Sequence, residues 1–200
     1  MKRVSKGSFG YIKASRQFTI LRTIIIFAFC IGIFVLGLVL NHTNKNIFSI
    51  IAALGCLPTG WSAVNMIMFL RAKTCSEETY KKVEEHKGNL LIQYELEMTA
   101  YDTNYPIAAA TVLDKNVCCY TEQKDMDIND CEKHIHTQIM QSGYSSYTIK
   151  VFTDLDKFVN RLDQLEELRR EKKIDPQAIE DAWQPGTVQT CASVLRSISL

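Results

Sequence analysis

Two long uncharged stretches dominate the first third of the sequence. Residues 23–40 and 47–70 contain no Asp, Glu, Lys or Arg and are rich in Ile, Leu, Val and Phe. At about 1.5 Å of rise per residue, helices of these lengths would match the roughly 30 Å hydrocarbon core of a bilayer. The rest of the chain offers too little apolar sequence to bury two such helices in a soluble core. We therefore expect a two-helix transmembrane hairpin.

Charged residues are divided unevenly between the two parts of the chain. The 23 Lys and Arg residues nearly balance the 22 Asp and Glu residues, but no acidic residue precedes Glu77. Residues 1–70 contain seven basic residues and therefore carry a net charge of +7, which leaves 16 basic and 22 acidic residues, a net charge of −6, in residues 71–200. Basic residues near membrane spans stay on the cytoplasmic side. The pattern thus predicts a multi-pass protein of the cell membrane with both ends in the cytoplasm.

A basic tail, residues 1–22, precedes the first apolar stretch and has aromatic residues interleaved with its charges. Each Lys or Arg close to an anionic leaflet contributes about 1 kcal/mol of attraction. We expect this tail to bind the lipid surface, although the same residues also serve as the topology signal. The basic residues concerned are Lys2, Arg3, Lys6, Lys13, Arg16 and Arg22.

Small residues recur every four positions in the second apolar stretch, at Ala52, Cys56 and Gly60. Small side chains at this spacing allow helices to approach closely in lipid. The pattern is consistent with packing inside the hairpin or between copies of the chain, and equally with the ordinary composition of membrane helices.

A short juxtamembrane helix within residues 71–88 is expected next. Thr74-Cys75-Ser76-Glu77 has the form of a capping box, and Gly88 is a typical C-terminal stop. After Gly88, apolar and polar residues alternate with a period of two, which predicts a strand with one buried face. The apolar residues of this strand are Ile92, Tyr94, Leu96, Met98 and Ala100.

The remaining pattern completes a cytoplasmic α+β domain over residues 89–184, followed by a C-terminal tail over 185–200. Hydrophobic periodicity and turn residues predict the order α-β-β-β-α-β-α for the region after the hairpin. This length is sufficient for one hydrophobic core. The expected elements are a hairpin (107–113 and 117–122), a helix (128–139), a strand (147–152), a long helix (155–173) and a short helix (176–183).

Glu122-Gln123-Lys124, at the end of the expected hairpin, suggests one catalytic alternative. This Glu-x-Lys motif and the order of elements resemble the PD-(D/E)xK nuclease family. The resemblance implies a second-strand carboxylate, here Asp102 or Asp114, that joins Glu122 in binding a metal ion that activates water. Strand geometry places Asp114 more than about 15 Å from Glu122, and Asp102 precedes the paired strand. Asp102, Asp114, Glu122 and Lys124 are nevertheless the candidate catalytic residues of a membrane-tethered hydrolase.

No other metal or cofactor site is expected. Cys131, His134 and His136 offer ligand atoms, but helical residues two positions apart point about 200° from each other. Cys118 and Cys119 alternate faces of a strand. The chain has no Walker motif and no Gly-x-Ser-x-Gly motif.

These patterns favour a non-enzymatic function. We expect an oligomeric membrane protein whose cytoplasmic domain binds or senses an unidentified protein or small molecule. Its other expected partners are the bilayer and further copies of the chain, and no nucleic acid is expected. Besides the hydrolase, the remaining alternative is a small oligomeric channel.

Overall fold

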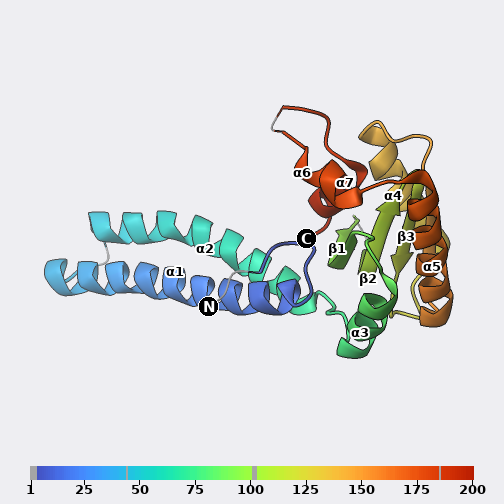
Figure 1. The fold of residues 1–200 in the computed structure, drawn as a ribbon. Coiled ribbons are helices and arrows are strands. Elements are labelled where there is room, and N and C mark those ends of the chain that lie inside the picture. Colours follow the sequence, from blue (N-terminus) through green and yellow to red (C-terminus); the bar gives the residue numbers. More distant parts are fainter. Residues whose placement is uncertain (1–3, 44, 101–102, 185) are drawn as a thin grey trace. The chain divides into compact units, whose positions relative to one another are not determined.

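The computed structural model describes residues 4–43, 45–100, 103–184 and 186–200 (Figure 1). These residues form two compact units. One contains Ile12–Ala72, and the other combines Val4–Tyr11 with Lys73–Leu200.

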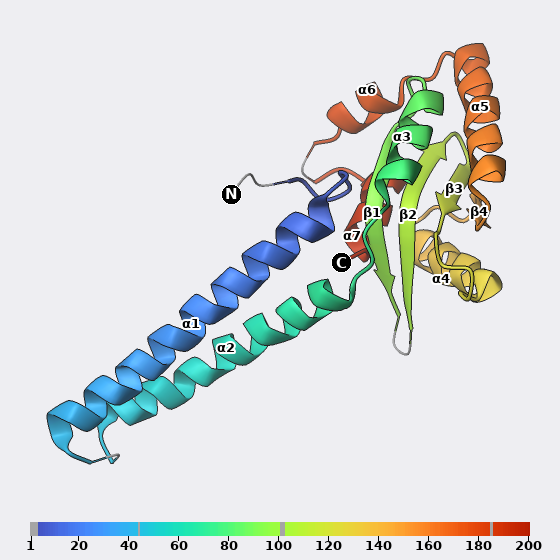
Figure 2. The ribbon, with the colours of Figure 1, turned by 90° about the horizontal axis from the view of Figure 1, so that it is seen from below.

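Two long antiparallel helices, α1 (Tyr11–Asn41) and α2 (Ile47–Arg71), make up the first unit (Figure 2). The side chain of Asn46 caps α2 by accepting a hydrogen bond from the backbone N–H of Ser49 at 2.9 Å. By length and composition both helices could cross a membrane, and only 11% of the most apolar window of each is buried. Helix α1 begins well before the uncharged stretch at residue 23, because the basic residues preceding it continue the same helix.

Small and polar side chains fill the contact between α1 and α2. A Cβ atom at Gly55 would lie 2.6 Å from Cys30 Sγ, so the two helices approach closely where Gly55 has no side chain. Ser62 is fully buried, and its Oγ lies 2.8 Å from the hydroxyl of Thr23. Close approach of small residues, together with hydrogen bonds between helices, is the usual way in which helices associate in lipid.

The second unit is built on a four-stranded sheet in the order β1-β2-β3-β4. Strands β1, β2 and β3 are antiparallel neighbours, and β4 runs parallel to β3 after the crossover through α4. This agrees with the predicted order of elements. The strands are β1 (Ile92–Thr99), β2 (Asn104–Leu113), β3 (Asn116–Tyr120) and β4 (Thr148–Phe152); the helices are α3 (Glu77–His86), α4 (Ile128–Gln141), α5 (Leu155–Lys172), α6 (Pro176–Asp181) and α7 (Cys191–Ile198).

Helices cover both faces of this sheet, which gives the unit two hydrophobic clusters. Side chains of α3 and α5, including Val83 and Phe158, fill one cluster. Side chains of α4 and α7, including Ile135 and Leu195, fill the other. Because helices cover both faces of the sheet, several polar residues of its strands, such as Gln93, Glu97 and Thr111, are buried as well.

Strand β1 does not keep one apolar face, contrary to the prediction. Tyr94 packs in the cluster of α3 and α5, whereas Leu96 and Met98 pack in the cluster of α4 and α7. The change coincides with Glu95, whose backbone has φ of +55°. A residue in this left-handed conformation interrupts the alternation of the strand, although the pairing register with β2 is the same before and after it. The regular apolar set of the sequence is therefore divided between two cores.

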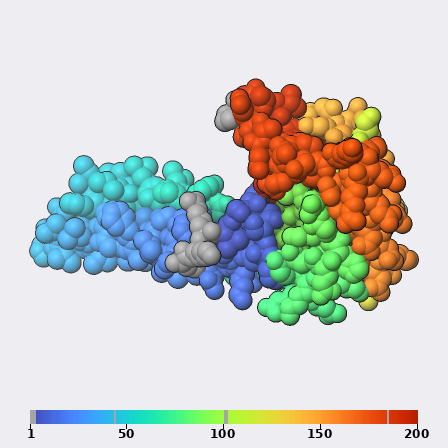
Figure 3. All heavy atoms as spheres, viewed as in Figure 1, coloured from blue at the N-terminus to red at the C-terminus, as the bar shows by residue number. Residues whose placement is uncertain are grey.

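The edge of β1 is covered by both terminal segments of the chain, which the sequence had suggested were tails. Gly7 O accepts a hydrogen bond from Tyr94 N at 2.8 Å, and Leu200 N donates to Glu97 O at 2.8 Å. Figure 3 shows the C-terminal residues, in red, against the green region that contains β1. Covering an edge strand removes its capacity to pair with other chains.

Candidate functional site

Glu122, the central residue of the predicted hydrolase site, serves as a partner for the start of α3. Its Oε1 accepts hydrogen bonds from Ser76 Oγ and Thr79 Oγ1, both at 2.7 Å, and from Ser76 N at 3.1 Å. A carboxylate at the positive end of a helix dipole is favourable. The role visible in the structure is thus to fix α3.

Of the other predicted catalytic residues, Asp114 lies far from Glu122. Asp114 lies at the β2–β3 turn and pairs with Lys172 at 2.7 Å, a hydrogen bond that lowers the pKa of the Asp114 carboxyl. Glu122 follows the opposite end of β3, about 20 Å away along the strand at roughly 3.3 Å per residue. Lys124 is exposed, and Asp102 lies outside the described residues.

The potential metal ligands are dispersed too. Within the described part of the chain, no group of three or more His, Cys, Asp or Glu side chains could hold a metal ion. Cys131 is fully buried in the core, and burial raises the pKa of its thiol to about 12. Its thiolate, the form that acts as nucleophile or ligand, is strongly disfavoured at neutral pH.

Two of the basic residues assigned to the lipid surface contact the second helix of the hairpin. Arg16 donates to the carbonyls of Phe69 at 3.1 Å and Ala72 at 3.0 Å, near the C-terminal end of α2. Arg22 donates to Ser62 Oγ at 3.2 Å, and its guanidinium lies 5.1 Å from the centre of the Trp61 ring. Lys13 is exposed, Lys6 belongs to the α+β unit, and Lys2 and Arg3 lie outside the described residues.

The predicted stripe of small residues contributes only partly to the hairpin. Ala52 is buried, whereas Cys56 and Gly60 are exposed and leave their side of α2 open. The two helices approach closely instead at Gly55 and at Gly37 of α1, where a Cβ atom would lie 2.5 Å from Phe48 Cβ.

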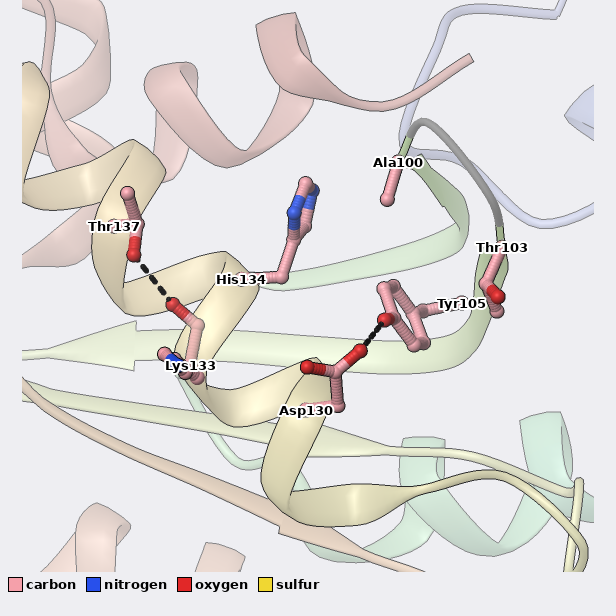
Figure 4. Close-up of a pocket in the computed structure, with 7 residues that line it drawn as sticks. All are labelled: Ala100, Thr103, Tyr105, Asp130, Lys133, His134 and Thr137. Carbon is pink, nitrogen blue, oxygen red and sulfur yellow. Dashed lines mark hydrogen bonds between the residues drawn. The ribbon is translucent and has the colours of Figure 1, made fainter.

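An open polar pocket of about 320 Å³ lies between the start of β2 and α4 (Figure 4). The hydroxyl of Tyr105 donates to Asp130, and this hydrogen bond is the largest cause that raises the pKa of Tyr105 to about 12. His134 lies with its ring centre 5.6 Å from that of Tyr105. These groups offer hydrogen bonds and charge, but among the described residues that line the pocket no nucleophile is paired with a base. Such a surface is suited to recognition.

A second cavity of about 280 Å³ lies where the N-terminal segment, Ser5 to Ser8, meets the start of β1 and helices α6 and α7. Lys6, Gln93 and Arg196 line it. Lys6 Nζ donates to Ser199 O at 2.6 Å, and Gly7 fits tightly against Arg196, since a Cβ atom there would lie 3.3 Å from Arg196 Cδ. This cavity is our main candidate site, because its wall includes the segment that continues directly into α1.

The sequence pattern places Lys6 at the lipid surface and indicates no role for Gln93 or Arg196. No local pattern could have joined them, because they come from three distant parts of the chain. Comparisons of the chain with protein-family models, curated proteins and solved structures each find no match.

Proposed function

We propose that this is a multi-pass membrane protein in which the α+β unit is a non-enzymatic sensing module that controls the helical hairpin. The observation that carries the proposal is that the α+β unit contains both chain segments that adjoin the hairpin. Val4–Tyr11 runs into α1, and Lys73 follows α2. A change in this unit thus reaches the hairpin through two covalent connections.

Both connections are anchored on the same strand, β1. At the connection that leads into α1, Phe9 stacks on Tyr80 with ring centres 4.1 Å apart, and Gly7 bonds to β1. At the connection that follows α2, the N–H of Lys73 donates to the buried carboxylate of Glu97 at 3.3 Å. A ligand that alters the packing of β1 would therefore affect both connections to the hairpin, and one that alters the packing of the N-terminal segment would affect the connection to α1.

The hairpin itself supports insertion into a bilayer. Large apolar side chains such as Phe29, Leu57 and Trp61 are more than 60% exposed along α1 and α2, a surface that water would disfavour strongly. The excess of basic residues on the flanks favours cytoplasmic ends and a short outer loop. Fusions to the C-terminus test this: green fluorescent protein should fluoresce and alkaline phosphatase should be inactive. The reverse result would contradict the orientation.

We further propose that the hairpin associates with a second copy of the chain. The exposed side of α2 that carries Cys56 and Gly60 is free of α1 and would permit close packing. Oxidation in membranes should then produce a disulfide-linked dimer through Cys56, and Cys56→Ser should abolish it. Purified protein that stays monomeric in mild detergent would argue against this assembly.

Control of the hairpin can be tested by hydrogen–deuterium exchange on the full chain in lipid nanodiscs. Phe9→Ala removes the stacking contact with Tyr80 and should accelerate exchange in residues 4–11 and also in the first turns of α1. Val188→Ala, at a residue that is 79% exposed, is the matched control and should change neither region. Acceleration confined to residues 4–11 would show that the segment does not act on α1.

A further inference from the structure

We propose that the cavity beside Lys6 binds a protonated phosphate group, either inorganic phosphate or a phosphate monoester. This inference rests on the proposed sensing function, for which it names the class of ligand. It stands on three features of the cavity: an unpaired cation, an unsatisfied oxygen, and a wall that is part of the segment leading to α1.

The ammonium group of Lys6 lacks a negative partner. Lys6 is half-buried, and it forms no ion pair with an acidic side chain of the described residues. Burial, and then the like charge of Arg196, lower the pKa of Lys6. An anion in the cavity would compensate both effects, because it would attract Lys6 and screen it from Arg196.

The acidic residues of the cavity are already engaged by other groups. Glu180 accepts from Arg196 Nη2 at 2.8 Å through one oxygen and from Thr190 through the other. Asp181 accepts from Gln177 Nε2 at 3.0 Å. Neither carboxylate reaches Lys6, so the positive charge there is open to a ligand.

Gln93 specifies the kind of anion. The residue is 5% exposed, and its Nε2 donates to Ala192 O at 2.8 Å, which fixes the orientation of the amide. Its Oε1 is buried and has no hydrogen-bond partner among the described residues. An unsatisfied buried acceptor costs about 1–3 kcal/mol, and only an N–H or O–H group can satisfy it.

A singly protonated phosphate supplies both requirements in one group. It carries negative oxygens for Lys6 and an O–H for Gln93. With a second pKa of about 6, roughly a tenth of a phosphate monoester carries this proton in solution at pH 7, and the buried acceptor would select that form. Sulfate and a simple carboxylate at neutral pH are acceptors only. The volume of about 280 Å³ exceeds that of phosphate itself and leaves room for the organic part of a monoester.

Binding would also move the N-terminal segment. Gln93 Oε1 is out of contact with solvent in this structure, so a ligand reaches it only if part of the cavity wall shifts, and the segment from Ser5 to Ser8 is the part of that wall that leads to α1. Gly7 and Gly10 have φ of +85° and +83° and would allow the backbone to rearrange on either side of Phe9. The shift leads directly to α1.

Calorimetric titration of the full chain in phosphatidylcholine nanodiscs tests the proposal, with inorganic phosphate at pH 7 and sulfate as the matched anion. We expect phosphate to bind at least tenfold more tightly than sulfate. Lys6→Met should weaken both anions at least tenfold. Gln93→Met should reduce the affinity for phosphate to that for sulfate, and Lys133→Met, in the other pocket, should change nothing.

Three results would overturn the proposal: no binding of phosphate, equal binding of phosphate and sulfate by the unmodified protein, or phosphate binding that survives Lys6→Met. A second titration identifies the source of the phosphate. Phosphatidic acid in the nanodisc should compete with inorganic phosphate if the natural ligand is a lipid headgroup, whereas phosphatidylglycerol, a diester, should not compete. Without competition by phosphatidic acid, the ligand is a soluble phosphate.

Failure of this inference is distinguishable from failure of the sensing function. If phosphate binds as expected but exchange in α1 is unchanged, the ligand class stands and the control of the hairpin is wrong. If Phe9→Ala accelerates exchange in α1 but phosphate does not bind, the control stands and the ligand class is wrong.

Discussion

Gly88 lies directly against the carboxylate of Glu166. A Cβ atom at Gly88 would be 2.6 Å from Glu166 Cδ, and Gly88 has φ of +52°. Glu166 is buried, pairs with Arg169 at 2.7 Å, and accepts from the N–H of Asn89 at 3.3 Å. The turn between α3 and β1 is therefore built around a carboxylate on α5, and it needs a residue without a side chain.

Gly88→Ala should destabilise the α+β unit by about 2–5 kcal/mol. The left-handed backbone costs an L-residue about 1–2 kcal/mol, and the collision with Glu166 adds about 1–3 kcal/mol of overpacking. Gly143→Ala is the matched control, because Gly143 also has positive φ but no described atom within 4 Å of its Cβ position. Urea unfolding followed by circular dichroism measures both variants. Equal losses of stability in Gly88→Ala and Gly143→Ala would mean that the contact between residue 88 and Glu166 is unimportant.

Ionisation of the Glu97 carboxyl should lower the free energy of unfolding as the pH rises. Its carboxyl is 3% exposed, and burial raises its pKa, although the hydrogen bond from the N–H of Lys73 opposes this. Between the unfolded-state and folded-state pKa values the folded protein binds more protons, so its stability decreases as pH increases through that interval.

Glu97→Gln should therefore stabilise the protein above this interval and have little effect below it. The amide oxygen can still accept from Lys73, while the buried charge is removed. Unfolding by urea at several pH values checks the difference, with Glu167→Gln, at an exposed residue, as the control. A stabilisation by Glu97→Gln that does not vary with pH would contradict the assignment to Glu97.

The buried cysteines should resist alkylation in the folded protein. Burial raises the pKa of Cys191 and of Cys75 to about 12, so few thiolates form at neutral pH, and both side chains are shielded from reagents. Iodoacetamide labelling followed by mass spectrometry should modify them only after unfolding. Ile179→Cys, at a side chain that is 53% exposed, provides a reactive control. Rapid labelling of Cys191 in the folded state would disprove its burial.

Elements with a strong local signal were predictable from the sequence. The order of helices and strands in the α+β unit follows periodicity and helix-start signals that act within a few positions. Even so, Ser76 caps α3 in place of Thr74, the first residue of the expected capping box. The division of β1 between two cores was not predictable. Its apolar alternation is perfect, and the interruption depends on the single backbone conformation at Glu95 and on helices that cover both faces of the sheet.

The candidate site was harder to predict because its residues meet only in the folded chain. A lysine near an apolar stretch fits a membrane-surface role, and nothing local shows that Lys6 contacts Ser199. For Glu122 and Lys124 the sequence does contain a local motif, but the contacts of Glu122 in the folded chain give it another role. Their spacing resembles a catalytic motif, but Glu122 bonds to Ser76 and Thr79 through contacts of long sequence separation.

Gly55→Ala should weaken the contact between α1 and α2. The added methyl group would lie 2.6 Å from Cys30 Sγ, so the helices must separate or rearrange, at a cost of about 1–3 kcal/mol. Gly60→Ala should be neutral, because no described atom lies within 4 Å of that Cβ position. Unfolding in detergent mixtures, followed by the fluorescence of Trp61, measures the effect.

The combination of Gly55→Ala with Cys30→Ala decides whether this contact causes the loss. The double variant removes the sulfur that the new methyl group would strike, so it should recover most of the stability lost in Gly55→Ala. Cys30→Ala alone also removes the contact with Thr59 Oγ1 at 3.5 Å and should cost little. Additive losses in the double variant would show that Gly55 is small for a reason other than its approach to Cys30.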